Sequence, residues 1–417
     1  MSGLNIYSGI SELITLKGAA KKQARQPVEK DLGLVKNASL VTYKGSVIWT
    51  GPSAKLTKAI LAPYGGIKNS NEIKLSSGTV MPSFIESHTH LVFAGERKNE
   101  FELRNQGVSY GEIAKAGGGI LSTVKATRKA SQKDLKSAAQ KRVNEFVSQG
   151  VTTLEIKSGY ALNLKDELKM LEVAKSLKGP HIVKTFLGAH ALPSNFKTYD
   201  AYIDFLLQKV LPKVAQSQLA ERVDIFIDEG YFQKSHGEKL FKAAQSFGLG
   251  LTMHADQMKL TKAYDLAIKY NAHSVDHLVQ IKKMDIKKLA QSSLTCNLLP
   301  GADFYLKMPY PPARALIDAG ARVSLATDFN PGSCPTQDLS FIGVLARLEM
   351  KMSLAEVITA YTLGAAFALN LQNQKGSLTT GKDADFILID GSYKDLFYQV
   401  GHHPVVGSWL KNKKLIK

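Results

Sequence analysis

Short apolar runs alternate with segments of helical periodicity through most of this chain. The apolar runs are rich in Val, Ile, Leu and Phe, which is typical of buried parallel strands. The predicted strands are 80–86, 152–156, 182–188, 223–228, 249–253, 274–277, 293–298 and 323–327. Predicted helices lie at 133–149, 164–177, 199–215, 237–247, 262–270 and 339–352. This α/β rhythm predicts a (β/α)8 TIM-like barrel, and a doubly wound open sheet is the alternative.

Both ends of the chain have a different texture, with shorter strand-like segments and frequent turns. The first part contains alternating segments at 12–16, 39–43 and 46–50. The last part has glycine turns and the sequence Gly381-Lys382-Asp383-Ala384-Asp385 before an apolar run. We therefore expect a small β-sandwich domain built from residues 1–78 and 373–417. The barrel domain would span residues 79–372.

The composition narrows the class of protein. The 417 residues are 44% hydrophobic, and no run of about 18 apolar residues is present. The first residues lack the order of charged, apolar and small residues found in a signal peptide. The two cysteines, Cys296 and Cys334, are too few for a disulfide framework. These features predict a cytoplasmic protein with reduced cysteines and no membrane partner.

The formal net charge of +18 raises a separate hypothesis, a polyanion partner. However, the lysines are scattered along predicted helices and are not interleaved with aromatic residues. The basic segment 21–30 is predicted to be an exposed loop. A solvated lysine-rich surface without a nucleic-acid partner is the favoured interpretation. A basic polyanion-binding protein without catalysis remains the alternative from a different functional class.

The strongest chemical signal is His88-Thr89-His90, directly after the first predicted strand. Strand side chains alternate between faces, so His88 and His90 would project to one side, about 7 Å apart along the backbone. Two such imidazoles are half of a metal site, although an isolated His-x-His is often an ordinary loop. The decisive question is whether other strands supply further ligands.

Three more candidate residues follow predicted strands: His254 after the fifth, His277 at the end of the sixth and Asp328 after the eighth. In a barrel, the carboxyl ends of all eight strands meet at one face, which carries the active site. We therefore predict that His88, His90, His254 and Asp328 bind a metal ion. Imidazole and carboxylate ligands suit Zn or Fe, with a coordination position left for water.

The set of motifs resembles the amidohydrolase superfamily, and within it the imidazolonepropionase family. The matching segments are 88–95 with Arg97, the glycine loop 116–120, 155–160, Gly188-Ala189-His190, 254–257, Asp276-His277, 327–333 and 381–385. The resemblance covers essentially the whole chain. It implies a metal-dependent hydrolase that opens the ring of 4-imidazolone-5-propanoate to N-formimidoyl-L-glutamate in histidine degradation. It also implies one divalent or trivalent metal ion per subunit, and a homodimer is common among such relatives.

Roles for individual residues follow from this chemistry. Hydrolysis of a cyclic amide requires an activated water and a group that moves its proton, and we assign that role to Asp328. His277 is expected to hydrogen-bond the attacking water or the developing oxyanion. The resemblance implies that Arg97, whose planar guanidinium can pair with two carboxylate oxygens, binds the propionate carboxylate of the substrate. The resemblance further implies substrate contacts by Tyr160, His190, Gln257, Asn330, Gly332 and Ser333. Residues 117–119 would form a mobile lid or an irregular turn.

Two other catalytic interpretations use similar ligands. A cyclic amidine or nucleobase deaminase generally has Glu three residues after the histidine of the fifth strand. Here that position is Gln257, and an amide cannot shuttle protons. A two-metal hydrolase would need a carbamylated lysine at the fourth strand, which instead ends in Asp228-Glu229. Lys157, at the end of the second strand, is expected to be badly placed to bridge two metal ions.

Overall fold

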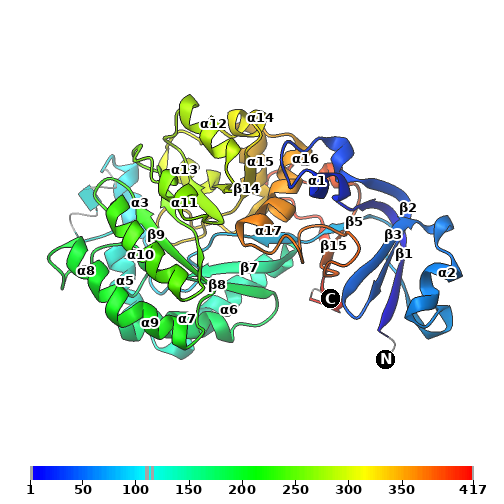
Figure 1. The fold of residues 1–417 in the computed structure, drawn as a ribbon, viewed down its shortest axis with the longest axis horizontal. Helices are drawn as coiled ribbons and strands as arrows, with labels where there is room; N and C mark the ends of the chain where they lie inside the picture. Colours follow the sequence, from blue (N-terminus) through cyan, green and yellow to red (C-terminus); the bar gives the residue numbers. More distant parts are fainter. Residues whose placement is uncertain (1–2, 109–111, 114–116, 416–417) are drawn as a thin grey trace.

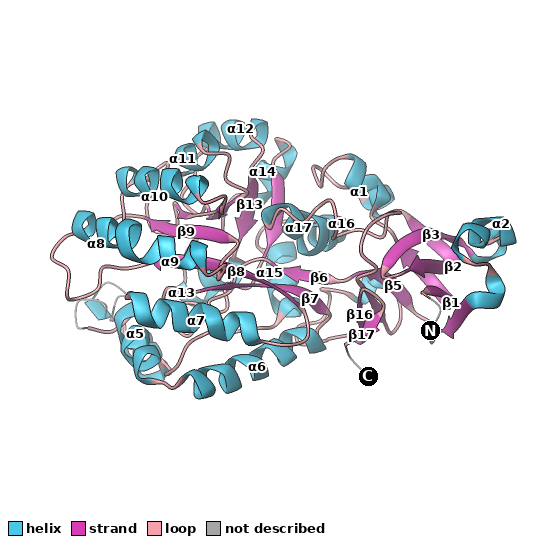
Figure 2. Cartoon of the chain, turned by 60° about the horizontal axis from the view of Figure 1, so that its bottom comes forward, coloured by secondary structure: helices cyan, strands magenta, loops and turns pink. Residues whose placement is uncertain are grey.

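A computed structural model describes residues 3–108, 112–113 and 117–415 of the chain. The molecule has two parts: a helix-covered barrel and a smaller sheet that combines the two ends of the chain (Figure 1). Figure 2 shows the helices around the outside of the barrel strands. None of the described helices is both long and apolar enough to cross a membrane.

Eight parallel strand positions form the barrel, as the sequence predicted. They are β6 (Phe84–Glu86), β7 (Val151–Lys157), β8 (His181–Ala189), β9 (Arg222–Ile227), β10 (Gly250–Leu251) continued by β11 (His254–Ala255), β12 (Ser274–His277), β13 (Thr295–Leu298) and β14 (Arg322–Leu325). Each strand pairs in parallel with its neighbour along this order. The last and first strands approach each other through a parallel bridge between Thr89 and Phe329.

A buried carboxylate reinforces this closure. Glu86 of β6 accepts hydrogen bonds from the backbone N–H groups of His88 and Thr327, both at 3.0 Å. Burial raises the pKa of Glu86 to about 8. Hydrogen bonds to Glu86 therefore link the ends of the first and eighth strand positions. This link confirms the barrel over the open-sheet alternative.

The helices of the barrel domain pack outside the strands. They are α3 (Lys98–Asn105), α5 (Ile120–Lys129), α6 (Gln132–Ser148), α7 (Leu164–Ser176), α8 (Tyr199–Phe205), α9 (Leu211–Gln216), α10 (Lys234–Ser246), α11 (Tyr264–Lys269), α12 (Lys283–Gln291), α13 (Pro300–Leu306), α14 (Ala313–Asp318), α15 (Leu339–Leu348), α16 (Leu354–Thr359) and α17 (Ala365–Ala368). The predicted helix 199–215 is interrupted by a π-helical turn at Leu206–Val210. Pro212 follows this turn and has no N–H to continue a regular helical ladder.

The second sheet contains strands from both ends of the chain. Its members are β1 (Leu4–Ile14), β2 (Leu34–Tyr43), β3 (Ser46–Pro52), β4 (Ser70–Lys74), β5 (Thr79–Pro82), β15 (Phe386–Ile389), β16 (Val405–Leu410) and β17 (Lys413–Lys414). The antiparallel pairing of β5 with β15 joins the early and late segments. The composite β-sandwich is thus confirmed, whereas the exact domain boundaries at 78 and 373 stay a prediction.

One predicted strand, 80–86, is divided between the two sheets. β5 pairs within the terminal sheet, and β6 begins the barrel after Ser83. The N–H of Ser83 donates to the carbonyl of Asp385 at 3.2 Å, and the N–H of Phe84 donates to that of Gly150 at 3.1 Å. The prediction of a single strand was wrong because a local apolar pattern does not show when a chain changes its pairing partner.

The basic segment 21–30 also differs in part from the expectation of an exposed loop. Arg25 donates hydrogen bonds to the carbonyl oxygens of Ala290, Ser292 and Gly320 at 2.5–2.8 Å. These acceptors lie before β13 and β14, at the end of the barrel opposite the predicted site. Arg25 therefore attaches the N-terminal segment to the barrel, while Lys21 and its neighbouring lysines remain exposed.

Candidate active site

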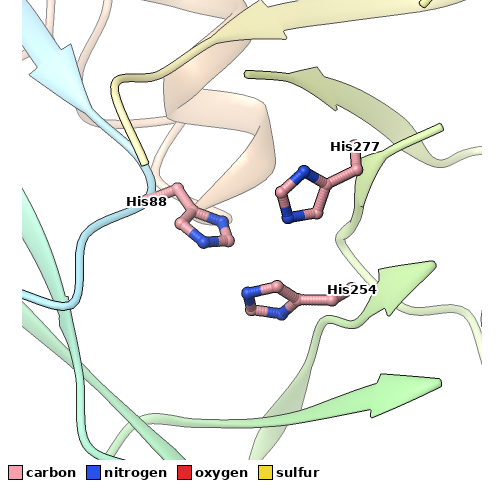
Figure 3. Close-up of side chains that lie close together, drawn as sticks. All are labelled: His88, His254 and His277. Carbon is pink, nitrogen blue, oxygen red and sulfur yellow. The ribbon is translucent and has the colours of Figure 1, made fainter. Parts of the chain in front are cut away.

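The predicted metal ligands meet at the carboxyl ends of the barrel strands. His88, His90, His254, His277 and Asp328 are all buried. Figure 3 shows the imidazoles of three of them, His88, His254 and His277, facing a common space from separate strand ends. The ring centroids of His88 and His254 lie 4.5 Å apart, and those of His254 and His277 lie 5.2 Å apart.

Three of these residues have donor atoms at the spacing of a metal site. His88 Nε2 lies 3.4 Å from both His90 Nε2 and Asp328 Oδ1, and His90 Nε2 lies 3.5 Å from the same carboxylate oxygen. In a tetrahedral zinc site with bonds of about 2.0–2.1 Å, ligand atoms are about 3.3–3.4 Å apart. The triangle of donor atoms therefore fits a divalent metal ion of this size.

A second group shares His88 and adds His254 and His277. Within the described part of the chain, His254 Nε2 and His277 Nδ1 are buried without a hydrogen-bond partner. Such orphaned atoms are rare in folded proteins and often mark a place for an ion or ligand. The structure thus gathers the four predicted ligands and the predicted catalytic histidine, as two overlapping groups.

Buried carboxylates behind the imidazoles determine how they present their nitrogens. His88 Nδ1 lies 2.6 Å from Asp276 Oδ2, and His254 Nδ1 lies 3.1 Å from Asp224 Oδ1. When Nδ1–H donates to a carboxylate, Nε2 carries the free lone pair that a metal ion needs. Asp276 and Asp224 therefore orient two of the predicted ligands, His88 and His254.

The role of Asp224 was not predicted from the sequence, and Asp276 was identified only as part of a matching segment. The available signal was a charged residue inside an otherwise apolar buried strand, since Asp224 lies between Val223 and Ile225 in β9. Charged side chains are almost never fully buried without a partner. Their position on the inner side of the strands, however, became visible only in the folded barrel.

The electrostatics of the cluster keep His90 and His277 neutral but favour a positive charge next to the carboxylates at His88. Burial lowers the pKa of His90 to about 4 and that of His277 to about 3. Burial and Lys157 both act to lower the pKa of His88, but Asp276 and Asp328 outweigh them and raise it to about 9. The carboxylates thus attract positive charge to the centre of the cluster.

Several backbone conformations at the site are unusual for residues other than glycine. Asp256, His277 and Asp328 have φ angles of 56°, 78° and 55°, in the left-handed region. Conformations of this kind are sparsely populated and concentrate at functional sites. They turn the chain sharply after β11, β12 and β14.

A cavity of about 320 Å³ opens over the cluster. Its lining comprises His90, Arg97, Ile120, Tyr160, His190, Phe226, Glu229, Tyr231, His254, Gln257, Met258, Lys259, His277, Leu306, Asp328, Asn330 and Ser333. Six of the seven residues assigned to substrate binding from the sequence are in this set, the exception being Gly332. The size suits a small organic molecule.

Arg97 is the buried cation of the cavity wall. Its Nε donates to Thr123 Oγ1 at 3.2 Å, and its Nη1 lies 3.8 Å from Glu100 Oε2. Gly332 lies directly against the guanidinium: a Cβ atom at this position would come within 2.0 Å of Arg97 Nη1. Gly332 therefore leaves the space that the Arg97 side chain occupies.

Asn330 holds the loop after β14 in shape. Its Nδ2 donates to the carbonyl of Asp328 and to Ser333 Oγ, both at 2.7 Å. Its Oδ1 accepts from the N–H groups of Gly332 and Ser333, both at 2.8 Å. With these hydrogen bonds, the Asn330 side chain fixes the loop residues that face the cavity.

Two further wall segments are anchored by buried carboxylates. Asp228 accepts hydrogen bonds from the backbone N–H groups of Gln257, Met258 and Lys259 at 2.8–3.1 Å. Glu167 accepts from three N–H groups of the loop 159–162, at 2.8–3.1 Å, and so supports Tyr160. Each anchor fixes a residue predicted to contact the substrate.

Aromatic rings form the cavity wall next to the predicted ligands. The His190 ring stacks on His90 with centroids 5.1 Å apart and 17° between the planes, and Tyr160 lies 5.2 Å from His190. His190 Nδ1 lies 3.0 Å from the carbonyl of Gly159. Residues 117 and 118 lie in the turn before α5, whereas Ala116 of the matching glycine loop is outside the described residues.

Comparison with known protein families shows to which family this chain belongs. The model described as "Amidohydrolase family" matches residues 79–415, most of the chain. The chain belongs to the amidohydrolase family. The match covers the barrel, the metal-binding cluster and the late strands of the terminal sheet, in agreement with the resemblance found in the sequence.

Curated relatives give a finer comparison within the amidohydrolase family. The chain is 56% identical over 396 residues to a protein of Bdellovibrio bacteriovorus named imidazolonepropionase, with 95% of this chain and 93% of the relative covered. A protein of the same name from Geobacillus kaustophilus is 38% identical, with 94% and 92% covered. The alignments with this chain cover nearly the whole length of both relatives.

Solved structures agree in fold. A zinc-bound adenosine deaminase from Xanthomonas campestris has a TM-score of 0.71 at 14% identity, with 99% of this chain and 92% of that chain covered. A triazine hydrolase variant has a TM-score of 0.74 at 15% identity, with 99% and 95% covered. At this identity the likeness extends to the barrel and its terminal sheet but not to the substrate.

Proposed function

We propose that this protein is a metal-dependent hydrolase that opens the ring of 4-imidazolone-5-propanoate to N-formimidoyl-L-glutamate, a step of histidine degradation. The observation that carries the proposal is that one cavity is lined both by residues of the His–Asp cluster and by Arg97. A cyclic amide with a carboxylate side chain requires both features. The imidazolonepropionases of Bdellovibrio and Geobacillus, aligned over nearly their full length, support the same substrate.

The ligand set proposed for the metal ion is His88, His90, His254 and Asp328. We propose one ion per subunit, Zn or Fe, since imidazole and carboxylate ligands accept both. When bound, the ion would supply a water of lowered pKa, near 7, as the nucleophile. The orphaned nitrogen of His254 and the triangle of donor atoms around His88 support this assignment.

The chain's own residues would then move the protons. Asp328 takes a proton from the attacking water as the water oxygen bonds to the ring carbonyl carbon. The same carboxyl group returns the proton to the ring nitrogen as the carbon–nitrogen bond breaks. His277, neutral and buried, donates a hydrogen bond to the developing oxyanion. The water oxygen ends up in the new carboxyl group, one water proton reaches the released nitrogen through Asp328, and the second leaves when the carboxyl group ionises.

The cavity wall would hold the rest of the substrate. The Arg97 guanidinium binds the propionate carboxylate, since its planar fork matches two oxygens. Tyr160 and His190 pack against the ring, and Gln257, Gly332 and Ser333 define the remaining space.

An ultraviolet assay with purified protein tests the proposal. The absorbance of 4-imidazolone-5-propanoate should disappear on incubation, with guanine and cytosine unchanged as controls for the deaminase alternative. Chelation should abolish turnover, and Zn²⁺ or Fe should restore it. Turnover of a nucleobase without turnover of the imidazolone would overturn the assignment.

We further propose that the protein works in the cytoplasm as a homodimer, without a nucleic-acid or membrane partner. Both cysteines are buried and free, which suits a reducing compartment. Leu348, Tyr398 and Val400 are 71%, 80% and 61% exposed, and a second copy would cover apolar surface of this kind. Light scattering tests the homodimer. Salt-dependent binding to nucleic acid would instead favour the basic polyanion-binding alternative.

A further inference from the structure

A lysine lies at the floor of the site, beneath the imidazoles. Lys157 ends β7, is 1% exposed and points into the barrel. Its Nζ lies 2.9 Å from Glu155 Oε1, 2.9 Å from Asp224 Oδ2 and 3.8 Å from Asp276 Oδ2. The ammonium group is therefore surrounded by three carboxylates from three different strands.

Two of these carboxylates are those that orient metal ligands. Asp224 contacts His254 Nδ1, and Asp276 contacts His88 Nδ1. Lys157 is thus linked to two proposed metal ligands, to His254 through Asp224 and to His88 through Asp276. The third carboxylate, Glu155, accepts a hydrogen bond from the N–H of Thr89 at 3.1 Å.

The charges explain why a cation is needed at this place. Three carboxylates within one dry space repel one another, and each is costly to bury without a partner. Burial alone would lower the pKa of Lys157, but Asp224, Glu155 and Asp276 together raise it above its ordinary value. The ammonium group is therefore charged and attracts the carboxylates to fixed positions.

We propose that Lys157 is a positioning residue of the metal centre. Its ammonium group holds Asp224 and Asp276 where they accept the Nδ1–H groups of the two imidazoles. His254 and His88 then present Nε2 to the ion without rearrangement, so Lys157 sets the affinity for metal. The inference rests on the proposed metal centre but not on the identity of the substrate.

The test is the metal affinity of the variant Lys157→Met in the full-length protein, measured by competition between Zn²⁺ and a chelator. Loss of a partner that orients ligands typically weakens metal binding by 10–100-fold, and we expect a loss of about this size. The visible absorption of the Co²⁺-substituted variant should also change, because it reports the ligand geometry.

Lys375→Met is the matched control. Lys375 is also buried and pairs with two carboxylates, Asp383 at 3.0 Å and Asp385 at 2.5 Å, but it lies outside the metal centre. It should lower thermal stability as Lys157→Met does, yet leave the metal affinity unchanged. A role of Lys157 in stability alone predicts the same affinity for both variants.

The double variant Glu155→Gln/Lys157→Met keeps the test decisive if the single variant does not fold. Without Lys157, the carboxylates of Glu155, Asp224 and Asp276 lack their cationic partner. The double variant removes the charge at position 155 and still leaves Asp224 and Asp276 without the ammonium group. Metal affinity within twofold of the unmodified protein, in either folded variant, would overturn the proposal. Failure of the imidazolone assay with normal metal loading would instead overturn only the proposed substrate.

Discussion

Substitution of Gly332 by alanine should damage substrate binding through Arg97. The φ angle of Gly332 lies outside the left-handed region, so alanine is compatible with the backbone. The added Cβ, however, would lie 2.0, 2.3 and 2.6 Å from Nη1, Cζ and Nη2 of Arg97. Carbon and nitrogen atoms without a bond need more than about 3 Å, so the guanidinium must move by about 1 Å.

The magnitude follows from the contact that Arg97 is proposed to make. A hydrogen bond to a charged group contributes about 1.5–3 kcal/mol, and about 1.4 kcal/mol corresponds to a factor of ten. Gly332→Ala should therefore lower kcat/KM by about 10- to 150-fold. Most of the loss should appear as a higher KM, because the carboxylate is bound in the ground state as well as in the transition state.

The assay is the ultraviolet measurement of imidazolone turnover at varied substrate concentration. Gly343→Ala is the control, since its Cβ would lie 2.2 Å from Phe397 Cδ1, away from the cavity. It should lower thermal stability and leave KM unchanged. An unaltered KM in a folded Gly332→Ala variant would refute the assignment of Arg97 to the substrate carboxylate.

Three further outcomes are expected. His254→Ala should reduce both metal content and activity to background, measured by atomic absorption and the ultraviolet assay; full metal occupancy would remove His254 from the ligand set. Glu167→Ala leaves three buried N–H groups of the loop 159–162 without an acceptor, so urea unfolding should show a loss of at least about 3 kcal/mol. Burial and Arg222 lower the pKa of His273 to about 4, whereas the unfolded chain binds this proton near pH 6.5. The free energy of unfolding should therefore fall as the pH decreases from 6.5 to 4, and His273→Gln should reduce that fall by about 2–3 kcal/mol. The measurement is the free energy of unfolding of both proteins at several pH values. Identical pH profiles for the variant and the unmodified protein would contradict this prediction.

Several features of the molecule could be derived from the order of residues alone. Alternation of apolar runs and helical periodicity predicted the barrel, because these patterns reflect burial along each element. The carboxyl ends of parallel strands meet at one face, so the strand ends predicted that His88, His254 and Asp328 come together. The residue types then predicted a metal site, since ligand chemistry depends on side-chain identity.

Other features were decided only by the tertiary structure. The division of the run 80–86 between two sheets depends on distant pairing partners, and no local pattern records those partners. The position of Lys157 among three carboxylates depends on which strands are neighbours around the barrel and how deep each side chain lies. The need for glycine at position 332 arises from the approach of Arg97, 235 residues away. Such contacts are set by packing in three dimensions, which a one-dimensional pattern of polarity does not specify.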